Sequence, residues 1–489
     1  MARRGEEERG GTPEDLLRSA VEKALSLGAS YAEARYQLDY HEEVSLRNGF
    51  PVAGGSSVNS GIAVRVIVNG AMGFASTNRL KQNSVRNAVE RAVALARASA
   101  RLVKRPIEMS EENLGKDKVL VRPRVRFEHV DVQDRVEALR AADQGLLEGA
   151  RSSGVEAPSR FIGLTCGHTE KHVINSDGAD VYSWIPRVAI SFFYQLASDG
   201  RSIFRHKDLG ESRGWEGFER WRLDDYLRED AEAVGLVLRK GIAPPEGEMD
   251  VVLGPEVVGL ICHESAGHPG EADRMLGREA AQAGETYIKP DLLGTRIGSD
   301  AVTVVDDPTL PGSYGFYLYD EEGVKARERV LIERGVLREL LQNRETAAVL
   351  GTKSNGASRA SAYDREPIVR MANTYMKPGD HSLEELIEGI SFGVYIKTYS
   401  EWNIDDKRWN QRYTGVEAYL IRNGRLAEPV YKPILEITTK GLYSSIDAVG
   451  KDLEMTAGYC GKGEPMQAIP VWFGGPSVRV RKVRLLRPT

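Results

Sequence analysis

The sequence lacks the features of several protein classes. No run approaches the ~18 consecutive apolar residues that a membrane span needs. There is no basic excess, because 66 Lys and Arg face 71 Asp and Glu and give a formal net charge of −5, which argues against a nucleic-acid-binding protein. The three cysteines, Cys166, Cys262 and Cys460, are too few and too scattered for a disulfide framework. We therefore expect neither a membrane nor a nucleic acid among its partners.

The beginning of the chain also lacks an apolar stretch. Residues 1–11, MARRGEEERGG, are charged and are expected to form a loose tail rather than a secretory signal. Together with the low cysteine content, this predicts a cytoplasmic protein. The 489 residues leave room for two or three domains at roughly 100–200 residues each.

Helical and strand patterns alternate in the first half of the sequence. Capping residues predict a helix over 13–27, and helix-like patterns predict further helices over 84–96, 132–150 and 224–240. Runs rich in β-branched and aromatic residues predict strands over 31–38, 61–68, 160–165 and 173–196. Asn69-Gly70 predicts a type I′ hairpin turn. The polar segment 104–125 and the Pro-containing segment 243–247 are candidate linkers.

The second half changes to short β-rich runs separated by Gly and Pro. Strands are predicted over 302–305, 330–340, 394–398, 415–421 and 478–486. The alternation of Val with Arg in the last run favours an edge strand. We predict an α+β fold with a mixed α/β N-terminal domain over 12–245. A largely β C-terminal domain that carries a metal-binding helix is predicted over 246–489.

One motif carries chemistry. His263-Glu264-Ser265-Ala266-Gly267-His268 has the form H-E-x-x-x-H at the end of an apolar, helix-like run. Two neutral imidazoles can bind Zn²⁺ while the adjacent carboxylate moves protons for a water molecule. The motif therefore indicates metal-dependent hydrolysis, with His263 and His268 as ligands and Glu264 as the catalytic base.

The spacing of the two histidines needs a physical explanation. Residues four apart differ by about 40° around a regular helix, whereas residues five apart differ by roughly 140°. A regular helix therefore cannot direct both imidazoles to one ion. Gly267 allows backbone distortion, and Pro269 disfavours the α-region at His268. We predict that the helix widens to a π-type turn, or breaks, between His263 and His268.

A catalytic zinc site needs a third protein ligand. Cys460 is the best candidate, because small residues flank it in TAGYCGKG and a thiolate on zinc is stable at neutral pH. Glu271 and Asp273 are alternatives, either as ligands or as supports for the histidines. Cys262, next to the motif, is interpreted as a core residue.

Two further groups of polar residues resemble sites but favour other interpretations. His168 and His172 are four apart, yet they flank Thr-Glu-Lys between two predicted strands, where we expect a turn and no metal. Asp306 and Asp307 precede a proline and favour a turn-capping role.

The run DVVLGPEVVGLICHESAGHPGEAD resembles the signature of the TldD/PmbA family, and in particular the TldD branch that keeps H-E-x-x-x-H. The resemblance extends through GIAVRVIVNGAMGFASTN, RMANTYMKPGD, VEAYLIRNGRLAEPV and GYCGKG, and through a long block that begins PGSYGFYLYDEEGVKARERVLIERG. It covers nearly the whole chain, and these blocks together are far more specific than the short motif.

The resemblance implies a zinc metalloprotease with a hollow dimeric architecture, whose internal active site admits small or unfolded peptides. It implies His263, His268 and the position of Cys460 as ligands and Glu264 as base. Many members pair with a sister subunit that lacks the motif, so a homodimer or a heterodimer is implied. Members are linked to maturation of a peptide antibiotic and breakdown of an antitoxin, and an older label calls them modulators of DNA gyrase.

One block departs from the family. Residues 399–405, YSEWNID, stand where relatives often have a Gly-rich stretch, which puts inherited substrate specificity in doubt. The leading hypothesis is a metallopeptidase for small or unfolded peptides. The alternatives are a non-catalytic regulatory or scaffold subunit, against which the intact glutamate argues, and a metal hydrolase that acts on a non-peptide amide.

Overall fold

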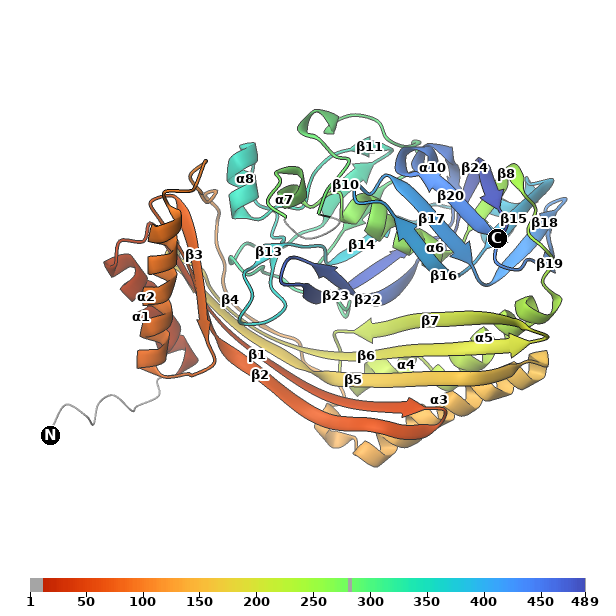
Figure 1. Ribbon diagram of the computed structural model, residues 1–489, viewed down its shortest axis with the longest axis horizontal. Coiled ribbons are helices and arrows are strands. Elements are labelled where there is room, and N and C mark those ends of the chain that lie inside the picture. Colours follow the sequence, from red (N-terminus) through yellow and green to blue (C-terminus); the bar gives the residue numbers. More distant parts are fainter. Residues whose placement is uncertain (1–11, 280–283, 489) are drawn as a thin grey trace.

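The computed structural model describes residues 12–279 and 284–488. Long strands from the first half of the chain form a curved sheet that runs beneath the second half (Figure 1). Helices line the outer side of this sheet and cover one end of it. The helices and strands together confirm the predicted α+β class.

The helices match the N-terminal predictions closely. The α-helices are α1 Pro13–Ser26, α2 Gln82–Ser99, α3 Val132–Ser153, α4 Trp215–Arg220, α5 Leu223–Lys240, α6 Pro255–Cys262, α7 Ala272–Met275, α8 Arg344–Leu350, α9 Leu383–Glu388 and α10 Thr439–Ser445. Short 3₁₀ turns occupy Phe127–His129 and Pro290–Leu292, and a π-helical turn occupies His263–Gly267.

The strands of the first half are longer than the sequence patterns predict. They are β1 Tyr31–Arg47, β2 Phe50–Val68, β3 Ala71–Thr77, β4 Lys116–Leu120, β5 Glu156–Asn175, β6 Asp180–Ser198 and β7 Arg201–Glu211. The strands of the second half are β8 Gly247–Leu253, β9 Val304–Asp306, β10 Arg329–Glu333, β11 Val336–Leu337, β12 Ser358–Arg359, β13 Ile368–Val369, β14 Asn373–Met376, β15 Phe392–Ile396, β16 Tyr399–Ile404, β17 Asn410–Gly415, β18 Ala418–Arg422, β19 Arg425–Pro429, β20 Ile434–Thr438, β21 Ile446–Val449, β22 Glu454–Lys462, β23 Gln467–Gly475 and β24 Val478–Leu486.

The curved sheet is antiparallel in the order β3-β2-β1-β5-β6-β7. β2 and β3 meet at the predicted hairpin turn, where Asn69 and Gly70 both have positive φ. β1 and β2 stay paired as far as Arg47 and Phe50. The first ten residues of β2 are exposed; most are small, and Phe50, Val52 and Val58 are exposed apolar residues among them. They therefore lack the apolar alternation by which a half-buried strand is recognised.

Two helical layers cover the curved sheet. α1 and α2 share an apolar core with β1 and β2, and α3 and α5 pack on β5 and β6. α3 approaches α5 closely because Gly149 has no side chain: a Cβ there would lie 2.1 Å from the carbonyl oxygen of Arg228. Each layer buries one apolar face of its helices, which stabilises the sheet above it.

The second half of the chain extends this sheet and adds another. Among the described residues, β22, β23, β14, β9, β10 and β11 continue the first sheet, which reaches 13 strands with β4 paired to β6. The junction is narrow, because β22 pairs with β7 only at Ala457 and Asp208. A nine-stranded sheet holds β8, β15 to β21 and β24. The apolar helix α6 belongs to the core cluster that both sheets share. The domain boundary near residue 245 stays a prediction.

Three local predictions are wrong. The candidate linker 104–125 contains β4, which pairs in parallel with β6. The C-terminal strand β24 is not an edge strand, because β20 and β8 flank it. Its arginines lie on its polar side, and Arg479 pairs with Asp447 at 2.9 Å. The segment 166–172 is not a turn but the continuous middle of β5.

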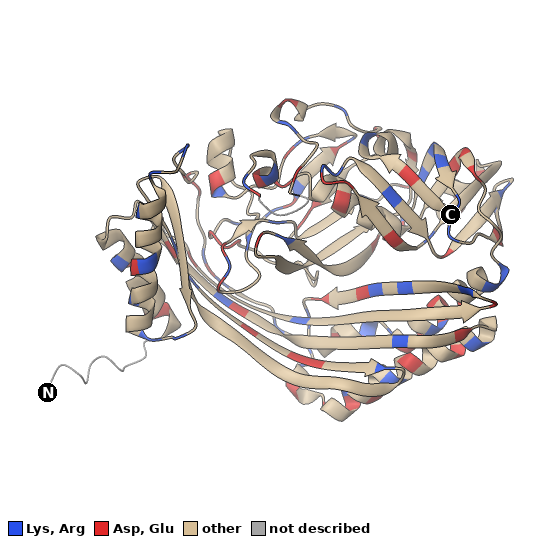
Figure 2. Cartoon of the chain, in the orientation of Figure 1, with Lys and Arg blue, Asp and Glu red and all other residues tan. Residues whose placement is uncertain are grey.

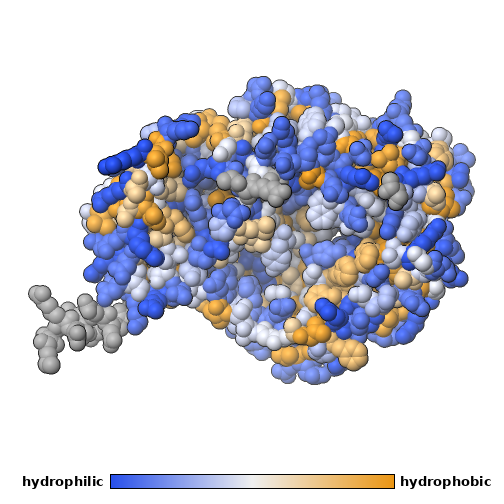
Figure 3. Space-filling model, viewed as in Figure 1, coloured by the Kyte–Doolittle hydropathy of each residue, from blue (hydrophilic) through white to orange (hydrophobic). Residues whose placement is uncertain are grey.

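Charges of both signs are interspersed over both halves of the chain (Figure 2). On the face shown in Figure 3, hydrophobic residues are scattered among hydrophilic ones. None of the helices within the described residues is both long enough and apolar enough to cross a bilayer.

Candidate metal centre

Helix α6 places the histidine motif in the interior of the second half of the chain. All eight of its residues are buried. It begins with Pro255 at the first helical position, where the missing N–H costs nothing. Gly259 allows α6 to lie against β23, because a Cβ there would be 2.8 Å from the Cα of Gly474. The end of α6 is therefore fixed by packing before the motif begins.

The predicted π-type turn is confirmed. The amide of His268 donates to the carbonyl of His263 at 3.0 Å, an i to i+5 bond that widens the helix. The two imidazole centroids consequently lie 4.9 Å apart, at 79° to one another. The widened turn thus brings together two side chains that a regular helix would separate.

The cause of the widening differs from the prediction. His268 keeps right-handed helical angles, φ −57° and ψ −46°, although Pro269 follows it. The influence of proline on its predecessor therefore does not explain the turn. Gly267 contributes by leaving space: a Cβ there would lie 2.0 Å from Sδ of Met371.

Cys460 on β22 completes a three-residue cluster. Its Sγ lies 3.4 Å from Nε2 of His268. One donor atom from each of His263, His268 and Cys460 lies within 4.8 Å of the others, and all three residues are buried. Burial raises the pKa of the Cys460 thiol, but its interactions with His268 and with Arg370 outweigh burial and bring the pKa down to about 7. Two imidazoles and a thiol of this acidity form a donor set that suits Zn²⁺.

The Nδ1 atoms of the two histidines have different surroundings, and both are compatible with metal binding by the ring. Nδ1 of His268 lies 3.1 Å from the carboxylate of Glu271, so its N–H donates there and Nε2 is left as an acceptor. Nδ1 of His263 is buried and has no hydrogen-bond partner among the described residues. Burial lowers the pKa of His263, which favours the neutral, ligating form.

The two acidic alternatives act as supports in this geometry. Glu271 holds His268, and the charges of Lys462 and Arg274 outweigh its burial and lower its pKa well below the ordinary value. Asp273 accepts two hydrogen bonds from Nζ of Lys462, at 2.6 and 2.8 Å. Among the described residues, neither carboxylate belongs to the cluster with the two histidines and the cysteine.

Glu264 lies in the same cavity, of about 340 Å³, as His263, His268 and Cys460. Arg408 donates a hydrogen bond to its carboxylate, and both side chains are almost fully buried. Burial raises the pKa of Glu264, but His268, Arg408 and His263 outweigh it and lower the pKa below the ordinary value. Glu264 is therefore an ionised carboxylate able to accept a proton.

The segment that departs from the family forms part of this cavity. Residues 399–404 are strand β16, which pairs with β17 in a hairpin, and Tyr399 and Trp402 line the cavity. Asp405 holds the hairpin turn by accepting from the amide of Trp409 at 2.7 Å. Arg408 lies in this turn at φ 63°. Arg408 is not predictable from the sequence, because a basic residue in a polar turn carries no signal of its partner.

The groups interpreted as non-functional have structural roles. His168 stacks between Tyr40 and Trp184, and Nε2 of His172 bonds to Asp180 at 2.8 Å. Cys262 is fully buried in the core, as predicted, and burial raises its pKa to about 12.

Asp306 and Asp307 also act locally. Asp307 caps its turn by accepting from the amide of Thr309 at 2.8 Å, as predicted. Asp306 instead has its carboxylate buried against Arg329 and Thr374.

Comparisons with known proteins agree with this architecture. The family model of the PmbA/TldA metallopeptidase C-terminal domain matches residues 246–486, and the model of domain 1 matches residues 32–96. A metalloprotease from Methanothermobacter thermautotrophicus is 34% identical over 453 residues, which covers 92% of this chain and 94% of the relative. A zinc metalloprotease TldD homologue from Saccharolobus solfataricus is 28% identical over 467 residues, 95% of this chain and 98% of the relative.

Solved structures share the fold. TldE from Thermococcus kodakarensis superposes with a TM-score of 0.74 at 18% identity and covers 96% of this chain and 99% of its own. A protein from Thermotoga maritima, described as a modulator of a DNA gyrase, gives a TM-score of 0.76 at 19% identity, with coverages of 97% and 100%.

The names of these relatives support a metallopeptidase. A curated relative that is more than 30% identical over nine-tenths of both chains, together with two matched family domains, is sufficient for assignment. The chain belongs to the PmbA/TldD metallopeptidase family.

Proposed function

We propose that this chain is a zinc-dependent peptidase that hydrolyses small or unfolded peptides. The observation that carries the proposal is the convergence of His263, His268 and Cys460 beside an ionised Glu264 in one cavity. His263, His268 and Cys460 would hold the ion. Zinc bound there would supply a Lewis acid that polarises a peptide carbonyl and makes water more acidic.

The protein residues then have separable roles. Glu264 would take a proton from the attacking water and pass it to the departing amine. Arg408 would keep Glu264 ionised and correctly oriented until that transfer, because its charge favours the carboxylate. Glu271 would fix the ring of His268 through Nδ1.

Strand β22 offers a binding surface for an extended peptide. Among the described strands, its edge next to β7 is paired only at Ala457, so residues 458–462 leave that edge open beside Cys460. A peptide backbone can add to such an edge and gain main-chain hydrogen bonds with little demand on its sequence. A folded protein cannot present an extended segment in this way, so unfolded or small peptides are the proposed substrates.

The relatives suggest an assembly. The TldE neighbour shares the fold along almost the whole chain, so a heterodimer with a TldE-like sister subunit, or a homodimer, is part of the proposal.

The decisive experiment incubates purified, zinc-loaded protein with an unstructured peptide, with and without a chelator. Mass spectrometry should show chelator-sensitive cleavage of the backbone. Glu264→Gln should keep one zinc per chain and lose at least 100-fold in kcat, since a general base contributes about 10²–10⁴-fold. Cys460→Ala should lose zinc.

Two outcomes would favour the other functions. A zinc-loaded protein that binds the peptide but never cleaves it would favour a regulatory or scaffold subunit. Cleavage of a non-peptide amide, with peptides left intact, would favour the alternative hydrolase. A Cys460→Ala variant that keeps its zinc would remove Cys460 from the ligand set.

A further inference from the structure

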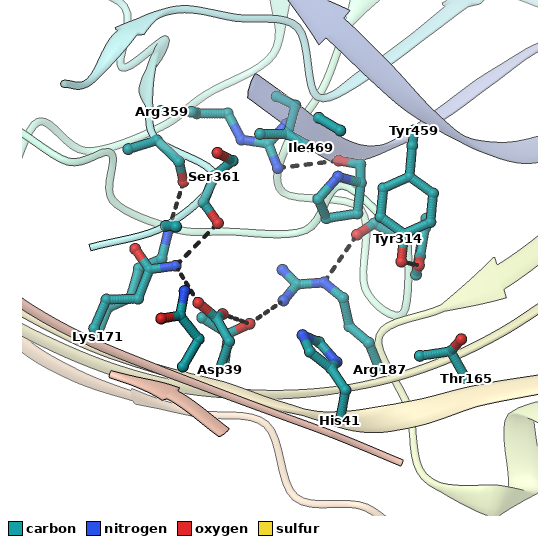
Figure 4. A pocket seen from close by; sticks show the side chains of 17 residues that line it. Asp39, His41, Thr165, Lys171, Arg187, Tyr314, Arg359, Ser361, Tyr459 and Ile469 are labelled. Carbon is teal, nitrogen blue, oxygen red and sulfur yellow. Dashed lines mark hydrogen bonds between the residues drawn. The ribbon is translucent and has the colours of Figure 1, made fainter. Parts of the chain in front are cut away.

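A second cavity, of about 240 Å³, lies between the curved sheet and the second half of the chain (Figure 4). The sheet contributes Asp39 and His41 from β1, Lys171 from β5 and Arg187 from β6. The opposite wall contributes Arg359 and Tyr459. The cavity is therefore lined by polar side chains from both halves of the chain.

Three cations and one anion line this cavity, a formal charge of +2. Nζ of Lys171 is paired with Glu321, which lies behind the lining. Arg187 and Arg359 form no ion pair with any carboxylate in the described part of the chain. Two guanidinium groups thus line the cavity without a directly paired carboxylate among the described residues.

The hydrogen bonds of the two arginines leave capacity for a ligand. Arg187 donates from Nε to the carbonyl of Tyr314 and from Nη1 to the hydroxyl of Thr169, both at 3.2 Å, which leaves Nη2 for another acceptor. Arg359 donates to the carbonyls of Met371 and Pro470. Figure 4 shows Arg187 reaching from the sheet toward Tyr314 across the cavity.

The other charged groups reduce this charge without removing it. Glu321 balances Lys171, and Asp39, which accepts hydrogen bonds from Gln37 at 2.8 Å and Thr169 at 2.9 Å, balances one of the two arginines, so one positive charge is left over. Burial lowers the pKa of His41 and favours its neutral form. Burial also lowers the pKa of Arg187, and it lowers the pKa of Arg359 to about 10. Holding these arginines charged is costly, and an incoming anion would offset that cost.

The cavity adjoins the metal cluster along β22. Tyr459 lines both cavities and directly precedes Cys460, and Ile469, also in the lining, is the strand partner of Cys460. Consecutive Cα atoms are about 3.8 Å apart. An extended peptide on the open edge of β22 could therefore lie in both cavities at once.

We infer that this second cavity binds a carboxylate of the peptide substrate, with Arg187 as the principal donor. The inference rests on the proposed peptidase function and adds a substrate class to it: peptides that carry an acidic side chain or a free C-terminal carboxylate near the cleaved bond. A guanidinium matches a carboxylate geometrically, and the cavity, of about 240 Å³, has room for such a group.

The test compares unstructured peptides that differ only in the carboxylate. One pair carries Glu or Gln at a single position that is moved along the peptide, and the other pair ends in a free acid or an amide. Binding is measured by fluorescence anisotropy on zinc-loaded Glu264→Gln protein, which cannot consume the peptide, and KM is measured on the unaltered protein. We expect about tenfold tighter binding of the carboxylate member of one pair, as for a single charge-assisted bond. The peptide pair whose two members differ in affinity shows whether the bound carboxylate is an acidic side chain or the C-terminus.

Substitutions of Arg187 then test whether it binds the carboxylate. Arg187→Gln should reduce the ratio of the two dissociation constants, neutral peptide over acid peptide, to about one, and Arg187→Lys should keep part of that ratio. Arg140→Gln, an exposed position on α3, is the matched control and should keep all of it. The acid and neutral peptides are also compared on protein that keeps Arg187. A folding defect in Arg187→Gln therefore cannot obscure that comparison.

Equal binding of acid and neutral peptides, or a ratio that survives Arg187→Gln, would overturn the carboxylate site while leaving the peptidase intact. Absence of both binding and cleavage for every peptide would overturn the peptidase proposal, and the carboxylate site with it.

Discussion

Arg408 and Glu264 form a buried ion pair between a β-hairpin turn and the widened end of helix α6. The partners are 144 positions apart in the chain. The carboxylate that follows His263 is therefore held by a residue outside the histidine motif. The hairpin that departs from the family pattern thus acts directly on the proposed base.

Replacing Arg408 should alter the pH dependence of cleavage. The positive charge of Arg408 helps to lower the pKa of Glu264, so Arg408→Ala should raise that pKa and move the acid limb of kcat/KM to higher pH. Arg408→Lys should move it less, because the charge is kept. The measurement is a pH profile of kcat/KM for one unstructured peptide; an acid limb at the same pH in all three proteins would contradict a role for this ion pair.

Replacing Glu271 should weaken zinc binding. Glu271 accepts from Nδ1 of His268, and loss of such a supporting carboxylate lowers metal affinity by about 10–100-fold. We expect this loss in Glu271→Gln, measured by competition with a chromophoric chelator. Glu148→Gln, at an exposed position of α3, serves as the control and should bind zinc like the unaltered protein. Equal affinities in the two variants would exclude the supporting role.

Replacing Gly267 should destabilise the fold around the π-helical turn. An alanine Cβ would lie 2.0 Å from Sδ of Met371, so a side chain or the turn must move. Overpacking of this kind costs about 1–3 kcal/mol in the free energy of unfolding. Urea denaturation of Gly267→Ala should show this loss together with weaker zinc retention. Gly55→Ala on β2, where a new Cβ meets no atom within 4 Å, should stay close to the unaltered protein.

Glu256, at the start of α6, should contribute pH-dependent stability. Burial raises its pKa, but Arg205 and Lys207 outweigh it and lower the pKa to about 2 from the ordinary 4.5. A lowered folded-state pKa stabilises the fold above pH 4.5, and that contribution disappears as the pH falls toward 2. Glu256→Gln should therefore cost about 3 kcal/mol at pH 7, with the difference shrinking below pH 4.5. A difference that is constant from pH 7 to pH 3 would contradict this origin.

The local features of the site were predictable because they depend on neighbouring residues. Two histidines five apart cannot share a face of a regular helix, so the π-type turn follows from the spacing itself. Cys460 was proposed from its small neighbours, and the structure brings it to His268. Its role as a ligand stays a prediction. The helices α1, α2, α3 and α5 are likewise predictable from local sequence patterns, with a capping residue, Thr12, at the start of α1.

The remaining features depend on contacts that no local pattern encodes. Arg408 finds Glu264 only after β16 and β17 pair. The alternating Val and Arg of β24 suggested an edge, yet Arg479 and Arg481 meet Asp447 from β21, which satisfies their charge inside a sheet. The segment 166–172 was interpreted as a turn because polar residues interrupt its hydrophobic pattern. The strand continues through them: Thr169 and Lys171 face the second half of the chain, where Lys171 meets Glu321, whereas His172 faces the other side of the sheet and bonds to Asp180.

His268 and Cys460 are separated by 192 positions in the chain. An ion that bound both in the unfolded chain would have to close a loop of that length, and the entropic cost of loop closure rises with the logarithm of the loop length. In the folded chain α6 already lies against β23, where Gly259 contacts the backbone of Gly474. This entropy is therefore lost on folding and not on zinc binding. Affinity for zinc is therefore a property of this helix–strand interface, and a substitution such as Gly259→Ala, remote from any donor atom, should release the metal as the interface loosens.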